Sequence, residues 1–299
     1  MFFDEWNVLI VDDEPDVLAV TRLALKDVTV YGLPLKIHTA RSKAEAIEKL
    51  NTTLALPGAA EGACAVAFID VVMETDHAGL ELCDYIRNTA HNYSTQLFIR
   101  TGQPGVAPER KVIDDYDISG YFTKLEMTEQ KLYTFVKSGI RQWFSNWYAH
   151  LIANSTNEMV TKSASRAQLV GALTFIGEEG PQEGEPISGI VFEDEYFLSD
   201  YHPVQLRALR DELAMLPPAI TTPEGHSLTT DAKGRVLVSI VETPSTANYY
   251  YVADSPMVMP RPLLDITFHN GLVLATLWKR AAADLDQLSP ELAKQIKRA

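Results

Sequence analysis

The sequence predicts an α/β fold for the first part of the chain. The expected fold is a five-stranded, doubly wound parallel sheet (flavodoxin-like), joined by a long helix to a second, α+β domain. Two observations predict this organisation. Short apolar runs alternate with longer segments of helical period up to about residue 125. The chain also has 299 residues, about twice the most common size of one domain, so each domain has enough residues for its own core.

The expected strands are short, mostly apolar runs without amphipathic alternation, which is typical of strands that are buried on both faces of a parallel sheet. They are Asn7 to Val11, Leu35 to His38, Ala65 to Ile69, Gln96 to Arg100 and Ser119 to Phe122. The expected helices are Pro15 to Lys26, Ser42 to Asn51, Gly79 to Thr89 and Pro108 to Tyr116, followed by a long one from Thr128. Because strand and helix alternate five times, we expect helices on both faces of the sheet.

The long helix continues past the point where a compact domain would end. Its apolar residues recur at helical spacing: Leu132, Phe135, Val136, Ile140, Trp143, Phe144, Trp147, Leu151 and Ile152. We therefore expect a first domain at 1–127, a connector helix at 128–162 and a second domain at 163–299. Soluble proteins rarely leave such a stripe exposed, so we predict a homodimer through this helix. The alternative is that the helix folds back onto the second domain.

The second domain has a looser pattern. Strand-like runs occur at Ile187 to Phe192, Arg235 to Glu242 and Tyr249 to Ala253, before an apolar helix from about Leu263 to Ala283. The segments Gly177 to Pro186 and Pro217 to Gly225 are turn-rich. We expect His226 to lie in an exposed turn and Tyr249, Tyr250 and Tyr251 to alternate across a strand. A ligand pocket lined by these tyrosines is the alternative.

Composition excludes several classes of function. Lys and Arg number 26 against 40 Asp and Glu, which gives a net charge of −14, and a nucleic-acid binder would instead need a basic surface. We therefore expect no DNA binding. Cys64 and Cys83 are too few for a disulfide framework and suggest a reducing compartment. The start of the chain lacks the basic residues of a signal peptide, and no apolar run approaches the roughly 20 residues of a membrane span. The expected location is the cytoplasm, without membrane insertion.

Polar side chains follow four of the expected strands. Asp12 and Asp13 come after the first strand, Asp70 after the third, Thr101 after the fourth and Lys124 after the fifth. In open parallel sheets, sites form beyond the carboxyl ends of the strands. Each residue alone has an ordinary explanation as a helix cap, a turn residue or a surface cation. Their coincidence at one edge of one sheet predicts a site.

The chemistry of this site would be phosphoryl transfer. Three crowded carboxylates repel one another unless a cation lies among them. Mg²⁺ suits carboxylates from Asp12, Asp13 and Asp70, together with one backbone carbonyl, for which Val72 is the candidate. Transfer of a phosphoryl group to Asp70 places charge on three oxygens, which Mg²⁺ and Lys124 would neutralise.

The sequence resembles the receiver domains of two-component response regulators from residue 6 to about 127. The matching motifs are VLIVDDE, AFID, LFIRT and YFTK, which contain Asp12 and Asp13, Asp70, Thr101 and Lys124 respectively. The resemblance implies that Asp12 and Asp13 form the metal pair and that Asp70 is the phosphoacceptor. It also implies that Thr101 is the switch hydroxyl, that Lys124 senses the phosphate and that Tyr121 is the rotating aromatic. The alternative for Tyr121 is a packing role at the strand edge.

The chain departs from the receiver pattern in two places. The segment after Asp70, VVMETDHAGLEL, is one residue longer than usual before the glycine and lacks the usual proline, so we expect a reshaped loop. Leu125 follows Lys124 where a proline is common, so the usual cis peptide bond need not form there.

The form of this loop, with RTGQPGVAPER, resembles a narrower subfamily in which the receiver precedes a GAF-like domain and often an HD-GYP cyclic-di-GMP phosphodiesterase. The seven histidines here are His38, His77, His91, His150, His202, His226 and His269, and none is followed by Asp. No such catalytic domain is therefore expected in this chain, which is either a short member or cut before an output domain.

Three functions remain open at this point. The leading one is a response regulator, not an enzyme, that is phosphorylated on Asp70 with Mg²⁺ and relays the change through the long helix to a sensory or protein-interaction domain. Its partners would be a histidine kinase or phosphotransfer protein and an output protein that the sequence does not identify. The alternatives are a regulatory fragment of a cyclic-di-GMP phosphodiesterase and a small-molecule sensor.

Overall fold

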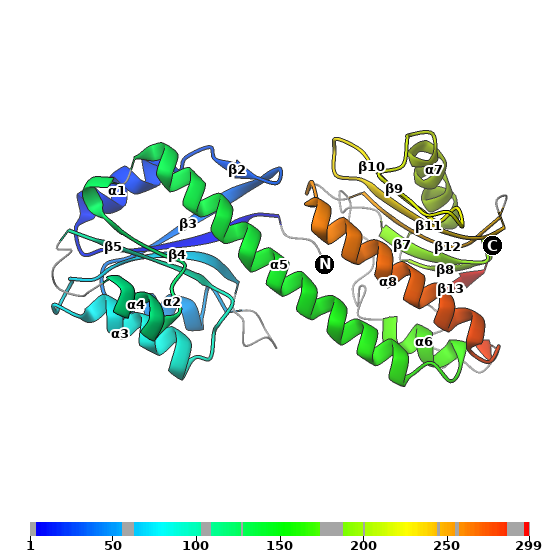
Figure 1. Ribbon diagram of the computed structural model, residues 1–299, viewed down its shortest axis with the longest axis horizontal. Coiled ribbons are helices and arrows are strands. Elements are labelled where there is room, and N and C mark those ends of the chain that lie inside the picture. The colour runs from blue at the N-terminus through cyan, green and yellow to red at the C-terminus, as the bar shows by residue number, and fades with distance from the viewer. Residues whose placement is uncertain are drawn as a thin grey trace. The chain divides into compact units, whose positions relative to one another are not determined.

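In the computed structural model the chain forms two compact units, Phe3–Trp147 and Tyr148–Ala299 (Figure 1). The structure describes residues 4–55, 63–102, 109–126, 128–173, 188–199, 201–243, 246–254, 257–285 and 296–298. The acidic stretch expected as a loop at Gly177 to Pro186 lies outside these ranges.

The first unit is built on a sheet in the order β2-β3-β1-β4-β5-β6. Its strands are β1 (Trp6–Val11), β2 (Thr29–Val30), β3 (Leu33–Ala40), β4 (Cys64–Asp70), β5 (Gln96–Thr101) and β6 (Gly120–Thr123). The five strands other than β2 pair in parallel and agree with the five that the sequence predicts. The doubly wound α/β fold is therefore confirmed for this unit.

The sheet has one strand more than predicted. β2 pairs antiparallel with β3, with Val30 opposite Leu33, through a two-residue turn at Tyr31 and Gly32. Both turn residues have positive φ, 52° and 85°, as in the type I′ turns that join twisted hairpins. A strand of two residues has no detectable apolar period, so the sequence pattern missed it.

The helices of the first unit are α1 (Pro15–Ala24), α2 (Lys43–Asn51), α3 (Ala78–Asp84), α4 (Glu109–Tyr116) and the first part of α5 (Glu129–Thr161). A π-helical turn, Tyr85–Thr89, extends α3, and a 3₁₀ turn, Lys124–Glu126, follows β6. Proline at its first position starts α1. The Ser42 side chain caps α2 by accepting from the backbone N–H of Glu45 at 3.2 Å.

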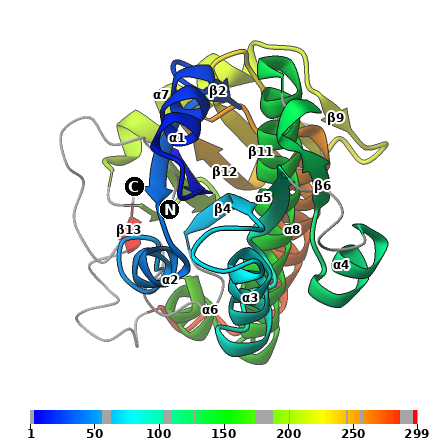
Figure 2. The same cartoon turned by 90° about the vertical axis from the view of Figure 1, so that its left-hand side faces the viewer.

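Helices cover both faces of this sheet, as the alternating pattern predicts. Alternate strand residues such as Leu9, Ile69 and Ile99 form one core with α2, α3 and α4. The opposite face carries stacked aromatic rings, with Phe122 4.7 Å from Phe135 of α5 between ring centroids. In Figure 2, α2 and α3 lie on the opposite side of β4 from α1. The central strands β1, β4 and β5 are thus buried on both sides, which explains their largely apolar sequences.

Helix α5 agrees closely with the predicted long helix. Its first part packs tightly on the first sheet, because a Cβ on Gly139 would lie 2.7 Å from Cγ2 of Val66. Trp143 and Phe144 are 1% exposed and contact the ring of Trp6 within the same unit. β1 of the same chain therefore covers these two rings, so they are not part of the stripe on which the predicted dimer rests.

The second unit contains a sheet in the order β13-β8-β7-β12-β11-β10-β9. Its strands are β7 (Ser188–Phe192), β8 (Tyr196–Leu198), β9 (Ile220–Thr221), β10 (Ser227–Thr230), β11 (Val236–Thr243), β12 (Thr246–Ala253) and β13 (Ile296–Arg298). Its helices are α6 (Arg166–Leu173), α7 (Pro203–Ala214), α8 (Arg261–Arg280) and the last part of α5. The three predicted strand runs and the predicted helix correspond to β7, β11, β12 and α8. Among the described residues, all pairings in this sheet are antiparallel.

Helices lie on both faces of the second sheet. Leu206, Leu209 and Leu213 of α7 pack on one face, and α6, α8 and Met159 of α5 pack on the other. Tyr249 belongs to the α8 core and Tyr250 to the α7 core. The predicted alternation of the tyrosines across a strand is therefore observed.

Both cysteines are fully buried, and burial raises the pKa of each thiol to about 12. This agrees with their interpretation as small core residues. Among the described residues, no helix is long and apolar enough to cross a membrane.

Candidate functional site

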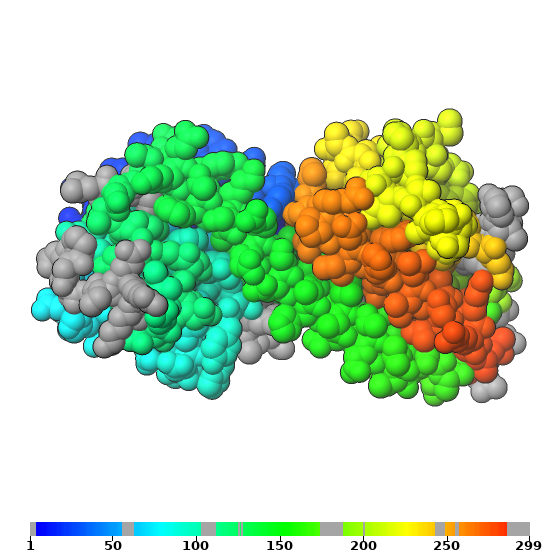
Figure 3. All heavy atoms as spheres, viewed as in Figure 1, coloured from blue at the N-terminus to red at the C-terminus, as the bar shows by residue number. Residues whose placement is uncertain are grey.

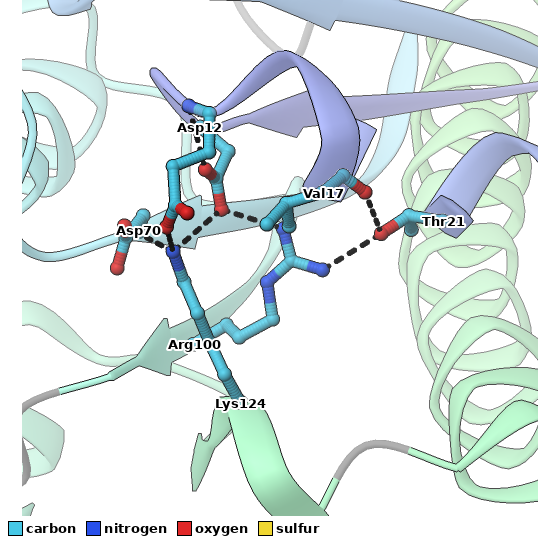
Figure 4. A network of polar contacts seen from close by, with 7 residues as sticks. Asp12, Val17, Thr21, Asp70, Arg100 and Lys124 are labelled. Atoms are coloured by element: carbon cyan, nitrogen blue, oxygen red, sulfur yellow. Dashed lines mark hydrogen bonds and ion pairs between the residues drawn. The ribbon is translucent and has the colours of Figure 1, made fainter. Parts of the chain in front are cut away.

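Three of the predicted site residues, Asp12, Asp70 and Lys124, meet at the carboxyl edge of the first sheet (Figure 4), and Thr101 ends a strand at the same edge. Asp12 follows β1, Asp70 ends β4, Thr101 ends β5 and Lys124 follows β6. The parallel pairing aligns these ends, since Asp70 lies opposite Arg100, the residue before Thr101. Sheet topology therefore accounts for the convergence that the sequence predicted.

Lys124 is the centre of this cluster. Its Nζ lies 2.7 Å from Glu14, 2.9 Å from Oδ2 of Asp70 and 3.1 Å from Oδ2 of Asp12. Burial lowers the pKa of Lys124, but its contacts with Asp70, Glu14 and Asp12 outweigh burial and hold the pKa above its ordinary value. Lys124 is therefore a permanent cation among three carboxylates.

Asp70 is 3% exposed and uses its two oxygens differently. Oδ2 accepts from Lys124, whereas Oδ1 is buried without a hydrogen-bond partner among the described residues. Burial raises the pKa of the Asp70 carboxyl, and Lys124 opposes this effect. A buried oxygen without a partner is costly, so this atom is the one at which a ligand or a reacting group would be stabilised.

Asp12 is fully buried and both of its oxygens have partners. Oδ1 accepts from the backbone N–H of Glu14 at 3.0 Å, and Oδ2 accepts from Arg100 at 2.8 Å as well as from Lys124. These contacts fix the position of its carboxylate next to that of Asp70.

The carboxylates that gather here differ in one member from the predicted set. Among the described residues, oxygens of Asp12, Glu14 and Asp70 lie within 4.8 Å of one another, and the exposed Asp13 is not part of this group. Contact with the Lys124 ammonium lowers the pKa of Glu14. Such oxygen donors fit a hard divalent cation such as Mg²⁺. The role of Asp13 as a metal ligand stays a prediction.

The remaining predicted residues lie around this cluster. Thr101 is fully buried at the end of β5, and Val72 is half-buried in the loop after Asp70. Tyr121, on β6, is half-buried and packs against the core beneath the site. Their roles as switch residues and as carbonyl ligand stay predictions.

The loop after Asp70 is held close to the acceptor strand. The backbone N–H of Gly79 donates to the carbonyl of Val71 at 3.0 Å. A Cβ on Gly79 would lie 1.9 Å from the backbone oxygen of Asp70. The described part of the chain contains no cis peptide bond.

Sequence reasoning missed two residues of this site, Glu14 and Arg100. Both stand inside the quoted motifs VLIVDDE and LFIRT, but neither received a role. The available signal was the arginine itself, because a charged residue in a strand buried on both faces needs a buried partner.

The second unit contains a small pocket near Trp278. A pocket of about 200 Å³ is lined by Arg166, Phe192, Glu193, Glu242 and Trp278, among others, and small-molecule sites usually measure roughly 300–1,000 Å³. Tyr249 and Tyr250 lie in the cores on opposite faces of the sheet. His226 accepts a hydrogen bond from the backbone N–H of Val241 at 3.2 Å.

Comparison with known proteins gives one curated relative. No protein-family model matches the chain. The chain is 38% identical over 168 residues to a 3'3'-cGAMP-specific phosphodiesterase 2 of Vibrio cholerae. The match covers 54% of this chain and 31% of that protein, so the chain spans about a third of the length of this relative.

The solved structures that match are distant in sequence. One is the signal receiver domain of an HD domain-containing protein from Pseudomonas fluorescens Pf-5, at 19% identity and a TM-score of 0.37, covering 46% of this chain and 97% of that chain. Another is a signal receiver domain of a two-component histidine kinase from Clostridium thermocellum, at 18% identity and a TM-score of 0.35, covering 45% and 96%.

The sheet order and the edge site define the class of the first unit as a receiver-type α/β domain. The resemblance to response-regulator receiver domains that the motifs predicted is thereby confirmed for this unit. The GAF-like resemblance of the second unit stays a prediction, although its α+β composition agrees with it.

Proposed function

We propose that this chain is a response regulator whose first domain accepts a phosphoryl group on Asp70 in the presence of Mg²⁺. The observation that carries the proposal is the state of the Asp70 carboxylate. Its Oδ2 is held by Lys124 at 2.9 Å, while its buried Oδ1 has no partner among the described residues. An oxygen that is fixed in position and free of hydrogen bonds is the natural nucleophile of the cluster.

The reaction joins Oδ1 of Asp70 to phosphorus and breaks the bond between phosphorus and the leaving group, which departs with the electron pair. Asp12, Asp13 or Glu14, Asp70 and the Val72 carbonyl would hold Mg²⁺, which when bound neutralises charge on the phosphoryl oxygens. Lys124 would move from a carboxylate to a phosphoryl oxygen, and Thr101 would donate its hydroxyl to another. Burial at the edge of the sheet strengthens both contacts.

The output of this switch would pass along α5. This helix contributes its first residues to the core of the first domain and its last residues to the second, and so it is the covalent element that both share. We expect the second domain to act as a sensory or protein-interaction module rather than as a catalyst.

The direct test is to incubate the full chain with acetyl phosphate and MgCl₂ and to measure its intact mass. The proposal is supported if the mass rises by one phosphoryl group, and if EDTA added before the phosphodonor prevents this rise. A protein that gains no phosphoryl group from acetyl phosphate, or from a panel of histidine kinases, would contradict it.

The lifetime of the aspartyl phosphate should depend on Val72. This half-buried apolar side chain, two residues after Asp70, cannot orient an attacking water. We expect Val72→Asn to speed dephosphorylation by on the order of tenfold, because an amide can position that water. Loss of label after removal of the phosphodonor measures the rate. Val72→Leu, which keeps an apolar side chain, should leave the rate unchanged, and equal rates in all three proteins would refute this account.

The partner that donates the phosphoryl group would dock beside α1. Val20 and Leu23 of α1 are 67% and 70% exposed, and contiguous exposed apolar residues often mark interaction sites. A groove of about 560 Å³ next to them extends to Lys124. A kinase or phosphotransfer helix placed there would lie next to the acceptor site.

The homodimer stays a prediction and now rests on the part of α5 in the second unit. A groove of about 320 Å³ with an apolar lining that includes Ile152, Ile266 and Val273 runs between α5 and α8, whose surfaces lie next to each other in Figure 3. We expect a dimer mass in solution for the wild type and a monomer for the double variant Ile152→Glu/Val273→Glu, measured by light scattering. Val204→Glu, at an exposed position on α7, is the control. A wild type that is monomeric at micromolar concentration, with and without phosphorylation, would rule the dimer out.

A second candidate function is the regulatory part of a cyclic-dinucleotide phosphodiesterase. The 38% identity to the Vibrio cholerae phosphodiesterase favours it. This chain's own histidines do not form the His-Asp pair that such a centre needs. Coding sequence for an HD motif in the same reading frame would decide between a separate regulator and a regulatory part.

A further inference from the structure

Arg100 is a buried cation inside the acceptor site. It is the penultimate residue of β5, is 3% exposed and pairs in register with Asp70 on the neighbouring strand. An arginine keeps its charge under all ordinary conditions, and burying that charge is unfavourable unless it is paired. Its position in a fully buried strand therefore requires an explanation in its contacts.

The guanidinium connects the acidic cluster to α1 (Figure 4). Its Nη2 donates to Oδ2 of Asp12 at 2.8 Å, and its Nη1 donates to the Thr21 hydroxyl at 2.8 Å. Thr21 in turn donates to the carbonyl of Val17 at 2.7 Å. The Nε of Arg100 is buried without a partner among the described residues. The direct partner of its charge is thus the Asp12 carboxylate.

The charges of the cluster show what Arg100 changes. The carboxylates of Asp12, Glu14 and Asp70 face the two cations Lys124 and Arg100. Without Arg100, Lys124 alone would neutralise three carboxylates. Arg100 and Lys124 both donate to Oδ2 of Asp12, and the backbone N–H of Glu14 donates to Oδ1, so a divalent cation that binds Asp12 would share an oxygen with one of these donors. Arg100 therefore stabilises the cluster without a metal and opposes the binding of one.

We propose that Arg100 is a positioning residue that acts as a resident counter-cation for Asp12. It keeps the acidic cluster assembled in the metal-free protein and weakens Mg²⁺ binding, so that the site fills only at high Mg²⁺ concentration or together with a phosphoryl group. The inference rests on the proposed function only in treating Asp12 as a metal ligand.

The test is a calorimetric titration of the full-length protein with MgCl₂, together with thermal unfolding with and without MgCl₂. Arg100→Met should lower the Mg²⁺ dissociation constant by roughly tenfold or more, because the buried site then contains one positive charge fewer to repel the divalent cation. Without metal, the same variant should melt at a lower temperature than the wild type. Its melting temperature should rise more on addition of Mg²⁺ than that of the wild type. Arg100→Lys, which keeps the charge, should retain a dissociation constant near that of the wild type.

Arg87→Met is the matched control. Arg87 is also buried, but it donates to the backbone carbonyls of Asn92, Thr95, Tyr116 and Asp117. Its loss should lower the melting temperature and leave Mg²⁺ affinity unchanged. Arg100→Gln serves as a second neutral variant. If neither neutral variant folds even in millimolar MgCl₂, the metal does not replace Arg100 and the inference is wrong.

The outcomes separate the two proposals. A wild type that binds no Mg²⁺ would contradict the metal-dependent function itself. A wild type that binds Mg²⁺ with the same or a lower dissociation constant than Arg100→Met would overturn only the role of Arg100.

Discussion

Asp70→Asn is expected to abolish phosphorylation by acetyl phosphate. The substitution keeps the size of the side chain, but an amide oxygen is a far weaker nucleophile than a carboxylate oxygen. It also removes the charge that pairs with Lys124 at 2.9 Å. The loss should be complete in the intact mass of the protein and in a gel that retards phosphoproteins. The fold should survive, because Asp70 lies at the end of its strand and already has one oxygen without a partner among the described residues.

The control for this prediction is Asp16→Asn, at an exposed position in the first turn of α1. It should be labelled like the wild type. Undiminished labelling of Asp70→Asn would refute the assignment of Asp70 as the phosphoacceptor. Labelling that does not depend on Mg²⁺ would refute the proposal that the acidic cluster holds a metal. Unequal melting temperatures of the wild type and Asp70→Asn in EDTA would show how far the carboxylate contributes to stability.

The first domain could be predicted well because the features that determine its fold and its site lie close together in the sequence. Each of the five parallel strands is an apolar run, and residues such as Asp12, Asp70 and Lys124 follow those runs directly. Once the sheet is parallel, the position of each residue along its own strand determines which residues meet at the edge. The strand β2 was missed because two residues, Thr29 and Val30, are too few to show a period.

The second domain was harder to predict because its sheet is antiparallel. The strands that were found, β7, β11 and β12, have runs of five or more residues. Two of those that were missed, β8 and β9, have three and two. The helix α7 was not predicted either, and one of its faces packs on Tyr250 and its neighbours. Pattern alone cannot assign so many short elements to one sheet.

The missed parts of the site depend on contacts between distant residues. Arg100 and Asp12 are 88 positions apart, and Lys124 and Glu14 are 110 apart. Nothing in either local sequence shows that these pairs meet. The same limit applies at Trp143 and Phe144. Periodicity shows that a helix face must be covered, but not whether its own chain or a second copy covers it.

Gly79→Ala is expected to destabilise the first domain strongly. Gly79 lies in the first turn of α3, where the chain passes against the end of the acceptor strand. A Cβ there would lie 1.9 Å from the backbone oxygen of Asp70, 2.8 Å from its carbonyl carbon and 2.9 Å from Cα of Val71. These are backbone atoms, so no side chain can rotate away to relieve the contact. Moving them would shift the carboxylate of Asp70 away from Lys124.

The expected loss is about 3 kcal/mol or more in the free energy of unfolding, at the upper end of what overpacking usually costs. Chemical denaturation followed by tryptophan fluorescence would measure it. Gly102→Ala is the matched control, because its Cβ would approach the nearest atom, Cδ of Lys124, only to an ordinary 3.8 Å. It places the same methyl group at the same edge of the sheet without the collision, and should change stability and labelling little.

If Gly79→Ala is as stable as Gly102→Ala and is phosphorylated at the wild-type rate, the backbone of α3 does not approach Asp70 as closely as the structure shows. If it folds but loses labelling, the loop after Asp70 positions the acceptor. Because Gly79 itself carries no side chain to bind a metal or a phosphoryl group, such a loss would come from the geometry of Asp70 alone.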